Sequence, residues 1–126
     1  MRKTIEVALA TIILALCITK AAGAPIEGTW IGTIHGQKAM TLSVSEVGGV
    51  LSGYIVMYVV DKKFGDPDAR VVGQDDRELR NVKWDGKVLR FSVQDPDAVF
   101  EMTPTGPNAG VLKSLSSGLN ASMRRQ

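Results

Sequence analysis

The fold is decided by residues 28–58, which read GTWIGTIHGQKAMTLSVSEVGGVLSGYIVMY. Within this stretch, residues 40–45 (MTLSVS) alternate apolar and polar side chains, the pattern of a strand with one buried and one solvated face. Gly48-Gly49 then supplies the positive φ angles that a two-residue hairpin loop requires. Such a loop pairs Val47 with Val50, and this register sets Leu42 opposite Ile55 and Met40 opposite Met57, so that apolar residues of both strands lie on one face.

The first 24 residues have the layout of a secretory signal peptide. Arg2 and Lys3 precede an apolar run from Val7 to Thr19, which is shorter than the roughly 20 residues of a membrane-spanning helix. Small residues follow, from Ala21 to Ala24, and contain the expected cleavage site. We therefore expect a signal helix over residues 1–24, a secreted or periplasmic protein, and no membrane contact after cleavage. An uncleaved N-terminal anchor is the alternative.

Charge and cysteine content restrict the function of the remaining chain. The leader holds three of the 15 basic and one of the 13 acidic residues, so 12 of each remain and their charges cancel. This balance does not favour a surface for nucleic acid. Cys17 is the only cysteine and lies in the leader, so the exported chain has no disulfide and no thiol chemistry.

Turn signals divide the rest of the sequence into short strands. A turn at His35-Gly36-Gln37, with either an odd number of loop residues or a bulge at Gly36, would bring Trp30 onto the face of Leu42. Asp85-Gly86 predicts a type I′ hairpin that pairs Val82 with Leu89. Further expectations are a long irregular stretch over Asp61–Glu78 with at most one short strand at Ala69–Gly73, inward side chains at Ala98, Phe100 and Met102, and a last strand over Gly110–Leu115.

These segments predict an all-β fold, an antiparallel up-and-down meander of seven to eight strands in residues 25–115. We expect the sheet to close as a small barrel, because closure removes its edges; a sandwich is the alternative. Residues 116–126 are polar and patternless, and we expect them to form a disordered tail.

Gly28-Thr29-Trp30 at the start of a small secreted β-meander resembles the calycin group, which includes lipocalins and avidins. Together with Leu51-Ser52-Gly53-Tyr54 it is most similar to the opening of avidin-type barrels, and it also resembles small secreted bacterial modules. The resemblance implies an eight-stranded barrel. It does not carry over the avidin ligand site, because the corresponding positions here are Ile31, Gly32 and Thr33.

The sequence shows no catalytic constellation. His35 is the only histidine, lies beside a turn, and has no recognisable nucleophile motif near it. The acidic residues of the 61–78 stretch lack the spacing of a calcium loop, and Asp66 and Asp68 are typical of turns. We therefore expect a protein that is not an enzyme and that holds no metal and no cofactor.

The large apolar side chains leave two functions open. They either fill the barrel or leave a cavity for a small apolar ligand at its mouth, for which the candidate binding residues are Trp30, Tyr54, Trp84 and Phe100. The alternative function is a structural or interaction domain, such as a homodimer. Its candidate interface is an apolar stripe on the outer face of the third strand: Tyr54, Val56, Tyr58 and Val60. The 61–78 stretch folding over this stripe is the competing interpretation.

Overall fold

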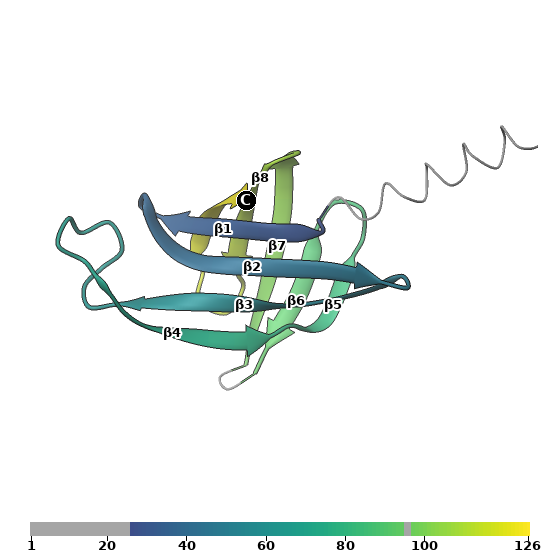
Figure 1. Ribbon diagram of the computed structural model, residues 1–126, viewed down its shortest axis with the longest axis horizontal. Coiled ribbons are helices and arrows are strands. Elements are labelled where there is room, and N and C mark those ends of the chain that lie inside the picture. Colours follow the sequence, from purple (N-terminus) through teal and green to yellow (C-terminus); the bar gives the residue numbers. More distant parts are fainter. Residues whose placement is uncertain (1–25, 95–96) are drawn as a thin grey trace, which may run out of the picture.

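The computed structural model describes residues 26–94 and 97–126, so the expected signal helix lies outside the described residues. The described chain is all-β and forms one nearly closed, barrel-shaped antiparallel sheet (Figure 1). Its strands are β1 (Gly28–Ile34), β2 (Gln37–Val47), β3 (Val50–Val60), β4 (Val71–Glu78), β5 (Arg80–Trp84), β6 (Leu89–Val93), β7 (Ala98–Gly106), β8 (Ala109–Ser114) and β9 (Asn120–Arg125). No helix in these residues has the length and hydropathy needed to cross a bilayer.

The strands follow one another around the sheet, and β1 pairs with both β2 and β9. The sheet begins at β4 and ends at β5, which are separated in the chain only by Leu79. At this residue the chain changes partner from β3 to β6, and the Leu79 N–H donates to the Gly53 carbonyl at 3.0 Å. The barrel is therefore closed except for a split between β4 and β5, the two edge strands of the sheet.

The hairpin of β2 and β3 confirms the predicted register. Val47 pairs with Val50, Leu42 with Ile55 and Met40 with Met57. Gly48 and Gly49 have φ angles of 58° and 82°, as a two-residue primed turn requires.

The preceding turn differs from the prediction in where the extra residue lies. Ile34 pairs with Gln37, so His35 and Gly36 form a two-residue turn with φ angles of 52° and 79°. The bulge lies at Ala39, between the pairs Thr33–Lys38 and Gly32–Met40. Because a bulge lets two consecutive residues share one face, both Ala39 and Met40 are buried.

The loop after Trp84 is longer than the predicted type I′ turn. Leu89 pairs with Trp84, whereas the prediction paired it with Val82. The four residues 85–88 form the loop. The Asp85 carboxylate holds it by accepting the N–H groups of Val88 at 2.7 Å and Lys87 at 2.8 Å. These two hydrogen bonds lower the pKa of the Asp85 carboxyl group, because they stabilise its charged form.

Two expectations about irregular segments were wrong. The stretch Asp61–Glu78 contains the eight-residue strand β4, where at most a short strand at Ala69–Gly73 was expected, and residues 116–126 contain β9 instead of a disordered tail. β9 fills the gap between β8 and β1, and its Ala121 and Met123 are each only 3% exposed. The last strand of the barrel is therefore β9, and β8 is the one before it.

The core fills the barrel around Trp30, which is completely buried. The Trp30 Nε1–H donates to the Ile26 carbonyl at 3.0 Å, so the residues just before β1 fold back and place the Ile26 side chain in the core. The other buried core residues come from β2, β3 and β6 to β9, together with Leu79 between β4 and β5: Ala39, Met40, Leu42, Val44, Ile55, Leu79, Leu89, Phe91, Val93, Phe100, Met102, Leu112, Ala121 and Met123.

Candidate functional site

A pocket of about 400 Å³ lies at the end of the barrel where β1 finishes and β2 begins. Side chains from the strands and from three loops line it, and most of them are apolar. They include Ile34, Met40, Met57, Phe64, Val93, Ala98, Phe100 and Leu119. Trp30 lies near the other end of β1 and does not line this pocket. The barrel is therefore packed toward one end and hollow toward the other.

Two polar side chains reach this pocket from different strands. Ser114 is the only buried polar residue in the described part of the chain, at 6% exposed, and its Oγ accepts the Ser117 N–H at 3.3 Å. Arg77 pairs with the buried Ile55, so it lies on the inner side of β4. Its Nη1–H donates to the Gln94 carbonyl at 3.0 Å. The Arg77 side chain thus spans the split between β4 and the end of β6.

The loop of residues 61–70 joins β3 to β4 and folds onto the β1–β2 turn. The side-chain amide of Gln37 forms two hydrogen bonds with this loop. Its Nε2–H donates to the Ala69 carbonyl at 3.5 Å, and its Oε1 accepts the Gly65 N–H at 3.2 Å. The contact at Gly65 is tight, because a Cβ there would lie 2.5 Å from the Cβ of His35. This arrangement places Phe64 against the core and in the wall of the pocket.

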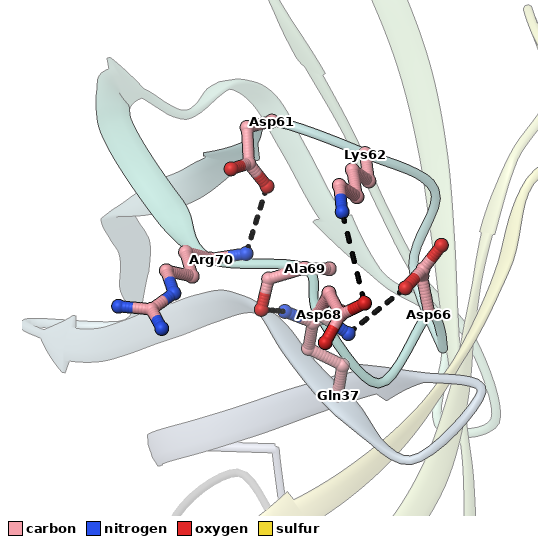
Figure 2. Close-up of polar contacts among 7 residues, drawn as sticks. All are labelled: Gln37, Asp61, Lys62, Asp66, Asp68, Ala69 and Arg70. Carbon is pink, nitrogen blue, oxygen red and sulfur yellow. Dashed lines mark hydrogen bonds and ion pairs between the residues drawn. The ribbon is translucent and has the colours of Figure 1, made fainter.

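The acidic residues of this loop stabilise its own turns, as Figure 2 shows. Asp61 and Arg70 close the loop, with the Arg70 N–H donating to Asp61 Oδ1 at 2.9 Å. Asp66 Oδ1 accepts the Asp68 N–H at 2.8 Å, which is the turn role predicted for these residues. Residues 26–94 and 97–126 contain no group of three or more His, Cys, Asp or Glu side chains arranged to hold a metal ion.

The four predicted ligand-binding residues do not gather at one place. Phe100 lines the pocket, and its ring stacks on Phe91 with centroids 5.3 Å apart. Trp30 is buried toward the other end, Tyr54 is 52% exposed on the outer face, and Trp84 lies beside the tip of the β2–β3 hairpin. Sequence reasoning missed Phe64, whose only signal was a single aromatic residue within a polar loop.

The apolar stripe of β3 is only partly exposed. Tyr54 is open to solvent, whereas Val56, Tyr58 and Val60 are half-buried. Tyr58 is shielded by β2: its hydroxyl lies 3.2 Å from the Thr41 hydroxyl, and Lys38 Nζ lies 5.1 Å from its ring centroid. Tyr58 also reaches the rim of the pocket.

No protein-family profile, curated protein or solved structure matches this chain.

Proposed function

We propose that the protein is an exported, non-enzymatic binding module that holds a small apolar molecule in the pocket at the open end of the barrel. The carrying observation is a cavity of about 400 Å³ lined mainly by apolar side chains. Ligand sites in proteins are concave and mostly apolar, with volumes of about 300–1,000 Å³. The proposal also includes the calycin-like character implied by the resemblance, and export directed by the expected signal peptide in residues 1–24.

The lining suits a hydrophobic ligand of variable shape. Met40 and Met57 provide flexible, polarizable side chains that adapt to a bound molecule. Phe64 and Phe100 provide aromatic surface from distant parts of the sequence, one from the 61–70 loop and one from β7. The few polar groups of the lining include the buried Ser114 hydroxyl and the side chains of Arg77 and Asp97, which can form hydrogen bonds with a polar part of a ligand.

A plugged variant tests this proposal. Ala98 lines the pocket, so Ala98→Trp places an indole in the cavity. Its neighbour Val99 is 37% exposed and lies on the other face of β7, so Val99→Trp is the matched control. The probe is N-phenyl-1-naphthylamine, whose fluorescence rises in an apolar site. We expect saturable binding to the wild type and the control, and affinity at least about tenfold weaker in Ala98→Trp, a loss of about 1.4 kcal/mol.

Two results would contradict a ligand site in this pocket. One is the absence of saturable probe binding to the folded wild type, and the other is equal binding by Ala98→Trp and Val99→Trp. Native mass spectrometry of the exported protein adds an independent measurement, because a ligand retained during purification appears as an added mass.

A further inference from the structure

The β4 strand leaves one side of the sheet open. β4 pairs with β3 only, and it is the first strand in the order of the sheet. β4 lies below β3 in Figure 1, and no strand of the described chain pairs with its other edge. All six residues from Val71 to Asp76 are exposed. Near the C-terminal end of β4, the Arg77 side chain donates a hydrogen bond to the Gln94 carbonyl, so this part of the strand has a neighbour. The free edge is therefore the segment from Val71 to Asp76.

The register identifies the backbone groups that this edge presents. The Leu79 N–H donates to the Gly53 carbonyl, so the backbone groups of Leu79 face β3. In an antiparallel pair these groups point alternately toward and away from the partner strand. Arg77, Asp75 and Gly73 therefore face β3, like Leu79. The N–H and C=O groups of Gln74 and Asp76 face outward, and no strand of the described chain receives them.

The side chains beside these groups are acidic on the outer face. Gln74, Asp76 and Glu78 pair with Tyr58, Val56 and Tyr54, which places them on the outer side of the barrel. No described cation forms an ion pair with Asp76 or Glu78. A second copy of β4 centred on Asp76 would set Asp76 against Asp76, and like charges directly opposite destabilise a strand pair. The edge thus disfavours self-pairing in this register and favours a cationic strand.

We propose that the β4 edge, from Val71 to Asp76, is a docking site for an extended cationic segment of another protein, which adds to the sheet as an antiparallel strand. Backbone hydrogen bonds to Gln74 and Asp76 hold the added strand, and lysine or arginine at alternate positions lies beside Asp76 and Glu78. Strand addition to an exposed edge is a common mode of peptide recognition, with affinity from the backbone and specificity from alternate side chains. This surface is separate from the ligand pocket, so the inference stands independently of the proposed function.

The first test uses two blocked seven-residue peptides, one alternating lysine with threonine and one alternating glutamate with threonine. Amide hydrogen exchange is followed on the wild-type protein. The lysine peptide should slow exchange at Gln74 and Asp76 and leave Gly73 and Asp75 unchanged, because the latter amides already face β3. Unchanged exchange at Gln74 and Asp76 would overturn the proposal, as would equal binding of the glutamate peptide.

The second test separates backbone pairing from charge. Gln74→Pro removes an N–H that points away from β3, so it spares the β3–β4 hydrogen bonds while blocking the edge. Gln74→Thr keeps the N–H and is the matched control. We expect peptide affinity at least about tenfold weaker in Gln74→Pro and in Asp76→Lys, and near wild type in Gln74→Thr. Equal affinities for the folded proteins would overturn the proposal. So would sedimentation showing a wild-type dimer that Gln74→Pro dissociates, because the occupant would then be a second copy.

Discussion

The guanidinium carbon of Arg125 lies 4.3 Å from the centroid of the Trp30 ring, and this contact joins the first strand of the barrel to the last. The two residues are register partners of β1 and β9. Arg125 also donates to the Pro107 carbonyl at 3.1 Å and to the Glu27 carbonyl. A cation over an indole contributes about 0.5–2 kcal/mol, more when it is desolvated. Arg125 therefore ties the C-terminal strand both to the core tryptophan and to two neighbouring loops.

The first prediction concerns Gly28, which makes room for this arginine. Gly28 has a φ of +133°, and a Cβ there would lie 2.7 Å from Arg125 Nη1. Gly28→Ala should destabilise the protein by about 1–3 kcal/mol, through backbone strain and displacement of Arg125. Urea denaturation followed by tryptophan fluorescence measures the loss.

Gly73→Ala is the matched control for that substitution. Gly73 lies in β4, where a Cβ would meet no atom within 4 Å, and it does not have a positive φ. Alanine there should leave stability unchanged or raise it by up to about 1 kcal/mol. Equal losses at Gly28 and Gly73 would show that the contact with Arg125 has no specific effect.

The second prediction tests the role of β9. Met123 is buried in the core, whereas its neighbour Ser122 is exposed. Met123→Ala should cost about 2–5 kcal/mol, as for other large core residues replaced by alanine. Ser122→Ala should change stability by no more than about 0.5 kcal/mol. A disordered tail would instead tolerate both substitutions equally, and thermal unfolding by circular dichroism distinguishes the two cases.

The parts of the fold that sequence predicts well are those with one buried face. The β2–β3 register follows from the alternation in residues 40–45 and from the two glycines of the turn, and both signals agree. For β4 the sequence indicates at most a short strand at Ala69–Gly73, because exposed residues predominate along β4 and no apolar periodicity marks its full length. β9 was missed because only Ala121 and Met123 carry its buried face, among polar neighbours.

For the candidate site too, the sequence predicts which face of a strand a side chain is on better than it predicts tertiary contacts. Phe100 was predictable because it alternates inward with Met102 along β7. Trp30 and Trp84 lie away from this pocket, a placement that was not predictable because alternation reports which face a side chain is on, but not which end of the barrel it reaches. The bulge at Ala39 and the side-chain bridge from Gln37 to the 61–70 loop depend on tertiary packing, which local sequence does not encode.

The third prediction concerns Gly86 in the loop after β5. Gly86 has a φ of +96°, and a Cβ there would meet no atom within 4 Å. The cost of Gly86→Val should therefore come from backbone strain alone, at about 1–3 kcal/mol. Gly86→Asn should cost less, because asparagine tolerates positive φ better than a β-branched residue. An unchanged melting temperature in Gly86→Val would contradict this account of the loop.

The fourth prediction uses the pH dependence of the adjacent Asp85. Hydrogen bonds from Val88 and Lys87 lower the pKa of its carboxyl group in the folded state. The folded protein therefore binds fewer protons at this site than the unfolded chain, and the stabilisation is present above the ordinary aspartate pKa of about 3.9. It is lost as the pH falls through the folded-state pKa.

The comparison variant is Asp85→Asn, which keeps a side-chain oxygen that can accept both N–H groups but removes the charge. Wild type should be more stable than Asp85→Asn at pH 7, and the difference should shrink as the pH falls below about 3.9. Denaturant unfolding at several pH values measures it. A difference that stays constant down to about pH 2, well below the ordinary aspartate pKa, would rule out a charge-dependent role for Asp85.

The last prediction tests whether the stripe of β3 is a self-association surface. Tyr58 lies near the middle of the stripe, with Lys38 over its ring. Tyr58→Glu would place a carboxylate beside Lys38, so the folded monomer should tolerate it, while a second copy docking on the stripe would have to bury that charge. The self-association hypothesis therefore predicts a wild-type dimer and a folded, monomeric Tyr58→Glu. Sedimentation velocity decides between the alternatives. A wild type that is monomeric at high micromolar concentration would contradict self-association. On the outer face, Tyr58 would then serve through its contacts with Lys38 and Thr41 within one chain.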